Sequence, residues 1–384
     1  MNALLSQFGH TSLPADAEVL RDKVRGFLNQ TLADRRPSEC ALSWAGFDAE
    51  FSAKLGKRGW IGMAFPKRYG GAEAGLFSRY VVVEELLAAG APVGAHWIAD
   101  RQSGALILRY GTDAQKERYL PGICRGETFM CIGMSEPGSG SDLASIESRA
   151  RPDGSGWVLN GCKLWTTNAH RSHYMIALCR TAERTEDKHA GTSQFLIDLS
   201  APGVTIRPIK DLTGSQHFNE VFFTDVHLDR EALIGREGDG WEQVMAELAY
   251  ERSGPERFLS SLALVKTLID AIGQNPDLVQ ARAIGRLTAR LATLRTMSLS
   301  VTSQLARGEN AAWAASVVKD LGTGFEQEIP EVARTLLEIE PRVGSGHDHA
   351  LVLALLTQMA PSFSLRGGTR EILRGIIARG LGLR

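Results

Sequence analysis

The sequence has few cysteines, and their arrangement suggests neither a disulfide framework nor a zinc site. Five cysteines occur among 384 residues, an odd number, scattered and without CxxC spacing. A small secreted fold would carry an even number at regular spacings, and a zinc site would use closely spaced pairs. We therefore expect reduced, mostly buried thiols, an intracellular protein and no metal site.

Long apolar runs and a surplus of one charge are also missing. No stretch approaches the roughly 20 consecutive apolar residues that cross a bilayer, and the N-terminus lacks the pattern of a signal peptide. Lysine and arginine number 43 and aspartate and glutamate 44, a net charge of −1. Because nucleic-acid-binding proteins normally carry a basic stripe, we expect no nucleic-acid partner. From the missing apolar runs and signal-peptide pattern we expect no membrane association and a cytoplasmic location.

The pattern of apolar residues changes twice along the chain. Residues 1–127 show helical spacing, as in Tyr80–Ala89. Residues 128–232 contain short β-rich runs separated by turns, which are typical of a small barrel or sandwich. Residues 233–384 return to helical spacing, with an apolar stripe from Ile284 to Leu305 that must pack against other helices. These three ranges are the expected domains.

Two motifs in the middle range point to a ligand. Met134–Asp142 (MSEPGSGSD) is rich in glycine and hydroxyl groups, and glycine lets a backbone approach a flat polar ligand closely. Gly161–Asn168 (GCKLWTTN) places Trp165 beside two threonines, which offers an aromatic wall and hydroxyl donors to a ring. An ordinary interdomain loop and a core tryptophan are the respective alternatives.

Taken together, the two motifs resemble those of the acyl-CoA dehydrogenase family. Further stretches that resemble this family are RGWIGMAFPKRYGG, RYGTDAQKERYLPGICRGE, FNEVFFTDVHL and GGTREILRGIIARGLGL. The resemblance implies a mostly α fold with a central β-barrel: an N-terminal α-helical domain, a middle β-barrel and a C-terminal four-helix bundle. It also implies FAD between barrel and bundle, an acyl-CoA substrate and an electron-transfer flavoprotein as electron acceptor.

The resemblance assigns roles to individual residues. The expected flavin contacts are Met134, Ser135, Ser141, Trp165, Thr167, Thr369 and Glu371. The expected substrate contacts are Ser141, Arg252 and Gly368. The backbone N–H of Gly367 is expected to polarise the thioester carbonyl. Thr369 is also predicted to be a helix N-cap, whose flanking glycines expose the first N–H groups of the helix to a ligand.

The catalytic base distinguishes two branches of the family. Many members place a glutamate directly before a Gly-Thr near the C-terminus, where this chain has Gly367, which cannot take a proton. A smaller branch, including the isovaleryl and long-chain enzymes, places its base on an early helix of the C-terminal domain. Glu251 falls at that position, directly before Arg252. We expect Glu251 to be the base; a solvated helix residue is the alternative.

Two stretches depart from the family pattern. Ala271–Asp277 stands where the family has an Arg-x-Gln-Phe-Gly stretch, in a region that is shortened here, and Arg342–His347 replaces the family's Gly-Gly loop. Both family elements serve the pyrophosphate and adenine end of FAD, the first from a neighbouring subunit. We expect a homo-oligomer, a dimer or tetramer, in which FAD is held weakly, a second acyl-CoA dehydrogenase-like chain completes the site, or another loop replaces the missing contacts.

The expected activity is therefore that of a flavoprotein oxidoreductase of lipid metabolism acting on a CH–CH group. Altered flavin chemistry, as in nitroalkane oxidases or sulfinyl-CoA desulfinases, is one alternative, against which Glu251 argues. A non-catalytic partner subunit of a heteromeric acyl-CoA dehydrogenase is another, against which the complete SEPGSGSD and WTT motifs argue. Bound flavin in the purified protein would favour the enzymes over the partner subunit.

Overall fold

The chain folds into two compact units, each assembled from separate stretches of sequence. The computed structural model describes residues 8–383, except for the side chains of residues 247–251. The helical unit contains the residues up to 46, 74–93 and those from 249 onward; the sheet unit contains residues 47–73 and 94–248. The expected order of helices, strands and helices is confirmed, while the three domain boundaries remain a prediction.

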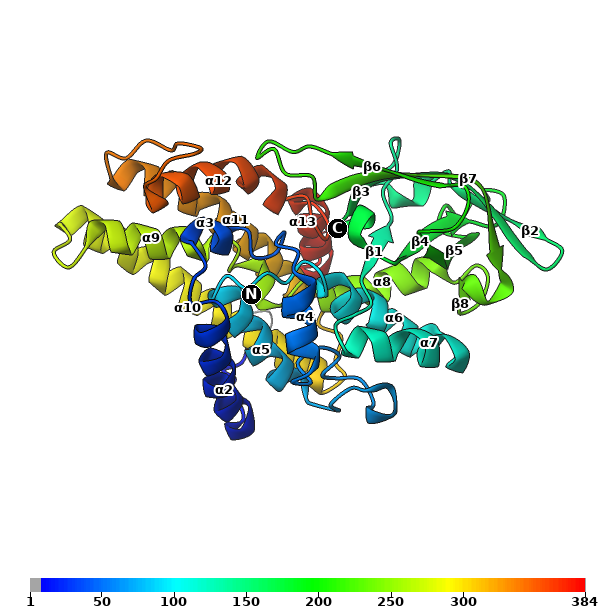
Figure 1. Ribbon diagram of the computed structural model, residues 1–384, viewed down its shortest axis with the longest axis horizontal. Coiled ribbons are helices and arrows are strands. Elements are labelled where there is room, and N and C mark those ends of the chain that lie inside the picture. Colours follow the sequence, from blue (N-terminus) through cyan, green and yellow to red (C-terminus); the bar gives the residue numbers. More distant parts are fainter. Residues whose placement is uncertain (1–7, 384) are drawn as a thin grey trace. The chain divides into compact units, whose positions relative to one another are not determined.

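The sheet unit is built on eight strands (Figure 1). They are β1 (Met130–Gly133), β2 (Arg149–Asp153), β3 (Gly156–Thr167), β4 (Tyr174–Arg180), β5 (Thr192–Asp198), β6 (Val204–Ile209), β7 (Phe218–Asp229) and β8 (Leu233–Ile234). Their order is β6-β7-β3-β2-β4-β5-β8, and β1 pairs with β4. The long strands β3 and β7 form an antiparallel pair.

The expected β-barrel is confirmed only as a sheet domain. Over the described residues the strand order ends at β6 on one side and β8 on the other, so the sheet is not closed. β6 pairs with β7, and β8 pairs with β5 through two residues. Short strands at regular spacings occur in open and closed sheets alike, so their spacing could not predict closure.

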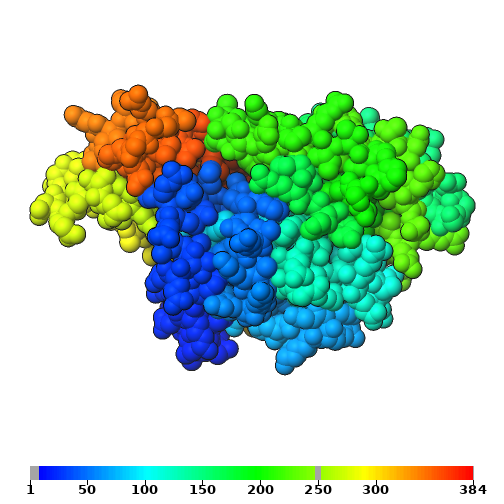
Figure 2. All heavy atoms as spheres, in the orientation of Figure 1, coloured from blue at the N-terminus to red at the C-terminus, as the bar shows by residue number. Residues whose placement is uncertain are grey.

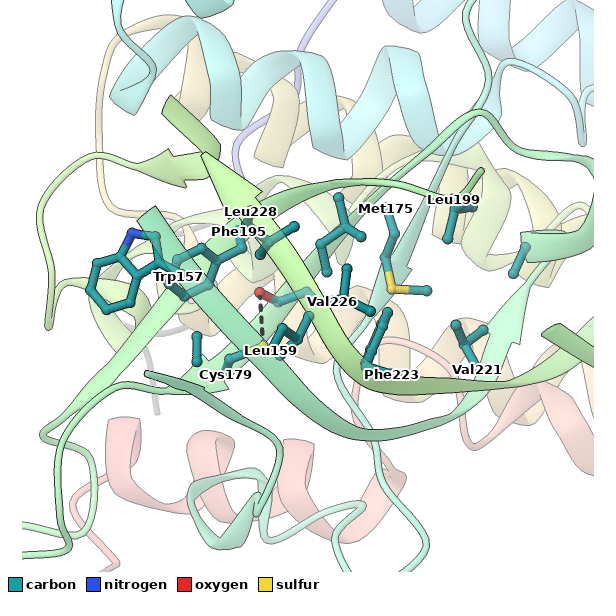
Figure 3. Packing of buried hydrophobic residues seen from close by; sticks show 14 of the residues in the cluster. Trp157, Leu159, Met175, Cys179, Phe195, Leu199, Val221, Phe223, Val226 and Leu228 are labelled. Atoms are coloured by element: carbon teal, nitrogen blue, oxygen red, sulfur yellow. Dashed lines mark hydrogen bonds between the residues drawn. The ribbon is translucent and has the colours of Figure 1, made fainter. Parts of the chain in front are cut away.

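An apolar core fills one side of this sheet. Figure 3 shows side chains from β3, β4, β5 and β7 gathered in it, with Trp157 edge-on to Phe195 at a centroid distance of 5.2 Å. β4 is buried along almost its whole length, which explains its unbroken apolar sequence. The core gives the two motifs that border β1 and β3 a rigid support.

Four helices belong wholly or mainly to the sheet unit: α4 (Ala49–Gly56), α6 (Gly104–Tyr110), α7 (Asp113–Cys124) and α8 (Gly240–Glu251), whose last three residues belong to the helical unit. A capping box begins α7, in which Thr112 and Gln115 accept each other's backbone N–H. The Gln115 amide also donates to the carbonyl oxygens of Glu231 and Leu233 at 2.6 and 3.0 Å. One side chain thus begins a helix and attaches it to β8.

The helical unit contains α2 (Ala15–Thr31), α3 (Pro37–Ala41), α5 (Leu76–Ala88), α9 (Leu262–Ile272), α10 (Leu278–Ala306), α11 (Ala312–Leu336), α12 (Asp348–Phe363) and α13 (Arg370–Gly380). α5 lies against α2 and α10, and buried ion pairs join the three helices. Glu84 on α5 accepts from Arg21 and from Arg295, at 2.9 and 2.7 Å. None of the described helices is long and apolar enough to cross a membrane.

The connection between α9 and α10 covers most of the shortened stretch. Gly273, at φ 75°, ends α9, and Asp277 caps α10 by accepting the Gln280 N–H. Most of residues 271–279 are exposed, and they lie at the surface in the yellow region of Figure 2. The segment where the family pattern breaks is therefore a short, accessible turn.

Candidate functional site

The two glycine- and hydroxyl-rich motifs of the sheet unit are held together by backbone contacts. The Leu164 N–H donates to the Ser135 carbonyl oxygen at 2.8 Å. The Lys163 ammonium donates to the Met134 carbonyl oxygen at 3.2 Å. The structure thus places Met134 and Ser135 beside the strand that carries Trp165.

A buried ion pair lies beneath this junction. Lys163 is fully buried and donates to Glu136 at 2.7 Å. The Glu136 carboxylate also accepts the backbone N–H groups of Glu147 and Ser148, at 2.6 and 3.0 Å. One carboxylate therefore connects the first motif, the second motif and the segment that leads into β2.

The environment of Glu136 keeps it charged. Burial by itself would raise the pKa of this carboxyl group, but the Lys163 charge and the hydrogen bonds from Lys163, Glu147 and Ser148 outweigh it and hold the pKa below its usual value. A buried carboxylate with this many donors is satisfied, whereas removal of its cation would leave an unpaired buried charge. The pair is therefore a structural requirement of both motifs.

Trp165 is not a core residue. It has φ +60°, lies where the β3–β7 register shifts between Lys163 and Thr166, and is 56% exposed. A bulge redirects side chains, and a left-handed backbone is unfavourable for a bulky residue unless its surroundings enforce it. The indole meets Phe218 edge-on at 5.9 Å. The strand thus presents an aromatic wall to its surroundings.

Polar groups next to this wall lack partners. Among the described residues, Thr166 Oγ1 and Asn168 Oδ1 are buried without a hydrogen-bond partner, although such groups are normally paired. Thr167 is half-buried and Ser141 is exposed. The exposed indole and the hydroxyl groups of Thr167 and Ser141 fit a flat ring that has hydrogen-bonding edges.

In the helical unit, Thr369 is the expected N-cap of α13. Its hydroxyl accepts the Ile372 N–H at 3.5 Å. Glu371 is exposed in the first turn, and its own backbone N–H, followed by the Thr369 hydroxyl, lowers the pKa of its carboxyl group. Both residues lie at a helix end that attracts negative charge.

The Gly367–Gly368 turn precedes this cap and is held by two cationic side chains. Its φ angles are +66° and +98°, which glycine adopts without strain. The Arg252 Nε donates to the Gly367 carbonyl oxygen at 3.3 Å, and the Lys319 Nζ donates to the Gly368 carbonyl oxygen at 2.7 Å. Both cationic side chains are buried. Arg252, expected to contact substrate, thus contacts the turn.

Arg366 anchors the same turn from its other end. Its guanidinium lies over the rings of Trp44 and Phe363, 4.2 and 4.7 Å from their centroids. It also donates to Ser260 at 2.6 Å and to the buried Glu326 at 3.1 Å. The residue before Gly367 is therefore fixed by stacking and by hydrogen bonds.

The expected site residues form one group in each unit. Met134, Ser135, Trp165 and Thr167 gather at the junction of the two motifs in the sheet unit, with Ser141 at the far end of the first motif. Arg252, Gly367, Gly368, Thr369 and Glu371 gather at the start of α13 in the helical unit. The side chain of Glu251 lies outside the described residues.

The motifs by themselves do not predict that the charges of Glu136, Lys163 and Lys319 are buried. For Lys319 a signal lies in its spacing along the helix. Lys319 lies four residues after Ala315 and three before Gly322, on the buried face of α11. A charge at a core position is costly unless it is paired, so it indicates a specific contact.

Comparisons with known proteins agree with this arrangement. Residues 14–127 match the family model described as "Acyl-CoA dehydrogenase, N-terminal domain". Residues 131–226 match the one described as "Acyl-CoA dehydrogenase, middle domain". The second match contains both motifs of the sheet unit.

Individual relatives extend the similarity to most of the chain. The chain is 32% identical over 343 residues to acyl-CoA dehydrogenase IpdE1 of Mycolicibacterium smegmatis, covering 84% of each protein. It is 38% identical over 244 residues to IpdE1 of Mycobacterium tuberculosis, a match that covers 62% of this chain and spans less than two thirds of the relative, 63%. Among solved structures, the "Tcur3481-Tcur3483 steroid ACAD" aligns with a TM-score of 0.86 at 26% identity, covering 97% of this chain and 100% of that one.

Proposed function

The chain belongs to the acyl-CoA dehydrogenase family, and from this we propose that it is an FAD-dependent oxidoreductase that removes hydrogens from the α and β carbons of an acyl-CoA thioester. Within this proposal, FAD supplies the acceptor for the β-hydride when bound. The electrons then pass to an electron-transfer flavoprotein, the acceptor that the family resemblance implies.

The residues of the sheet unit that would hold the flavin are those around the aromatic wall. Trp165 covers a ring face, while Met134, Ser135, Ser141 and Thr167 offer backbone and hydroxyl groups to its edges. Thr369 and Glu371 contribute from the start of α13. The exposure of the Trp165 indole supports the fit.

The chain's own groups move the proton and bind the carbonyl. Glu251 takes the α-proton, for which a positioned carboxylate contributes about 10²–10⁴-fold. The backbone N–H groups of Gly367 and Gly368 donate to the thioester oxygen as negative charge develops on it. A backbone donor does not depend on a side chain, so a glycine can fill this role.

The observation that carries the proposal is the conformation of Trp165. A left-handed tryptophan at a strand bulge, 56% exposed, is not explained by packing of the sheet. Such strain persists at sites where function requires it. The core alternative for this residue fails on its exposure.

An anaerobic titration of the purified flavoprotein with a panel of acyl-CoAs tests the proposal. At least one acyl-CoA should bleach the flavin, and the product should be the corresponding enoyl-CoA. Absence of bleaching across short, branched, long and steroid-derived acyl chains, in a protein that carries flavin, would contradict the proposal.

A second candidate is an enzyme built from two different chains that acts on a steroid-derived acyl-CoA. The similar structure is titled as a two-chain steroid enzyme, and the exposed Ala271–Asp277 segment lacks the family's arginine that reaches a neighbour's FAD. Sedimentation and flavin-to-protein ratio, measured after gel filtration, separate the candidates. A homo-oligomer that keeps stoichiometric FAD through prolonged dilution would exclude the need for a second chain.

A further inference from the structure

The Gly367–Gly368 turn is held through two consecutive carbonyl oxygens. Arg252 donates to the first at 3.3 Å and Lys319 to the second at 2.7 Å. Charged donors make stronger hydrogen bonds than neutral ones. Two adjacent peptide planes are therefore fixed by two side chains that come from different parts of the helical unit.

Lys319 is the less expected of the two. It lies in the middle of α11 and is fully buried. Its neighbour Asp320 faces the next helix and accepts from Arg370 of α13 at 2.6 Å. Burial of an ammonium group is costly unless donors are used, and a methionine would fill similar space without that cost. From this buried position Lys319 supplies a charged donor to the Gly368 carbonyl oxygen.

Because a peptide group is planar, fixing the carbonyl groups of Gly367 and Gly368 also fixes the direction of the N–H groups of Gly368 and Thr369. The peptides of the turn are trans, and in a trans peptide the C=O and N–H groups point in opposite directions. Because Arg252 holds the Gly367 carbonyl, the N–H of Gly368 points away from Arg252. Because Lys319 holds the Gly368 carbonyl, the N–H of Thr369 points away from Lys319. Neither N–H can turn without breaking a charge-assisted bond.

We propose that Lys319, together with Arg252, is a positioning residue that fixes the N–H groups of Gly368 and Thr369 toward the carbonyl oxygen of a bound thioester. This inference rests on the proposed function and adds a residue to it. Neither side chain needs to touch the substrate. Arg252 would act on the turn rather than on the CoA portion.

The role predicts selectivity for ligands that carry a carbonyl. Loss of Lys319 should weaken binding of an acyl-CoA thioester but not of the matching S-alkyl-CoA thioether, which lacks the carbonyl oxygen. Removal of a direct donor of this kind costs about 10²–10³-fold in rate. Because Lys319 acts through the turn, we expect a loss of about tenfold to a hundredfold in kcat/KM, shared between weaker binding of the thioester and a lower kcat.

The test compares Lys319→Met with Lys266→Met in the FAD-loaded protein. Lys266, on α9 of the same unit, also donates to a backbone carbonyl oxygen, that of Ala88, but is not part of the turn. Calorimetric affinities for the thioester and thioether should diverge in Lys319→Met and stay parallel in Lys266→Met. Equal losses for both ligands, or no loss, would overturn the proposal.

A less severe variant guards against loss of folding. Lys319→Gln keeps an N–H donor on a shorter side chain and should show the same selective loss to a smaller extent; wild-type selectivity in this variant would also overturn the proposal. Wild-type protein provides the reference. If an acyl-CoA bleaches the flavin of the wild-type protein while the Lys319 variants keep the wild-type ratio of thioester to thioether affinity, only the positioning role fails. If no acyl-CoA bleaches the wild-type flavin, the proposed function itself fails.

Discussion

The two units hold their loops by opposite ends of the peptide group. In the sheet unit, the Glu136 carboxylate accepts N–H groups from Glu147 and Ser148. In the helical unit, Arg252 and Lys319 donate to the carbonyl oxygens of Gly367 and Gly368. A carboxylate anchor consumes backbone donors, whereas a cationic anchor leaves them available.

This difference suits the two units to different roles: the sheet unit supports a ligand, and the helical unit supplies hydrogen-bond donors to a reaction. In the proposed function, the sheet unit provides a platform for the flavin, and its largest contact is the Trp165 indole. The helical unit offers backbone donors, which suit a developing negative charge. We therefore expect variants in the sheet unit to change stability and flavin content, and variants in the helical unit to change rates.

Glu251→Gln should show the largest effect and belongs to the second class. The rate of flavin reduction by the best acyl-CoA should fall by at least about 10²-fold, the range for loss of a general base. Flavin content and thermal stability should stay as in the wild type. Stopped-flow measurement of flavin bleaching checks the rate.

The matched control is Glu242→Gln, at an exposed position in the first turn of the same helix. It removes the same charge and should leave the rate unchanged. Near-wild-type bleaching in Glu251→Gln would remove this residue from the mechanism, and the contrast between the units would then lose its main support.

Lys163→Met should show the largest effect in the sheet unit. It leaves the Glu136 carboxylate buried without its cation, which costs about 3–5 kcal/mol in the free energy of unfolding. Flavin content should fall with it, because both motifs depend on the pair. Urea unfolding and absorbance after gel filtration measure the two quantities.

Two controls sharpen this result. Arg149→Met breaks a pair between β2 and the exposed Glu183 of the β4–β5 connection, and exposed pairs contribute little to stability. The double variant Glu136→Gln/Lys163→Met removes both charges and should recover part of the stability. If Lys163→Met were no more damaging than Arg149→Met, the ion pair would not be a requirement of the motifs.

Acid should destabilise the sheet unit through His96. This side chain is buried against the Ser52 hydroxyl at 2.8 Å, and burial lowers its pKa to about 4. The unfolded chain binds the proton near pH 6.5, so stability present above that pH is lost as pH falls toward 4. The full loss is about 3 kcal/mol, of which about 2 kcal/mol falls between pH 7 and pH 5, and urea unfolding at these two pH values measures that part.

The helical unit offers a parallel case. His349 is buried against Thr267 at 3.2 Å, and burial lowers its pKa as well. His96→Gln should reduce the acid sensitivity of the sheet unit, and His349→Gln that of the helical unit. Acid sensitivity unchanged in His96→Gln would show that other groups dominate.

Trp165→Ala should have the smallest effect on the free energy of unfolding, but it should selectively reduce the amount of bound flavin. The aromatic wall contributes roughly 0.5–1.5 kcal/mol beyond its buried area, so FAD should be lost during dialysis while the unfolding transition stays in place. Trp157→Ala is the contrasting variant, because Trp157 lies in the core and its truncation costs about 3–5 kcal/mol. Unchanged flavin content in Trp165→Ala would return that residue to a packing role.

Local patterns predicted much of the fold. The apolar spacing of Tyr80–Ala89 and of the stripe from Ile284 to Leu305 corresponds to α5 and α10. The Thr369 cap was also predictable, because capping depends on a few neighbouring residues. Strand β3 was harder to predict: the runs expected in this range are short, yet β3 extends from Gly156 to Thr167 through the bulge at Trp165.

The sequence by itself determined the family resemblance, the order of helical and β regions, and the candidate residues of the two motifs and of the last helix. These features depend on residue type and spacing along the chain. Only the tertiary structure decided that Trp165 is exposed, that the sheet is open over the described residues, that Lys163 is buried beneath the two motifs, and that Lys319 is buried beside the Gly367–Gly368 turn. Each depends on residues far apart in sequence: Lys319 and Gly368 are brought together only when α11 packs beside the turn before α13, and no local pattern encodes that meeting.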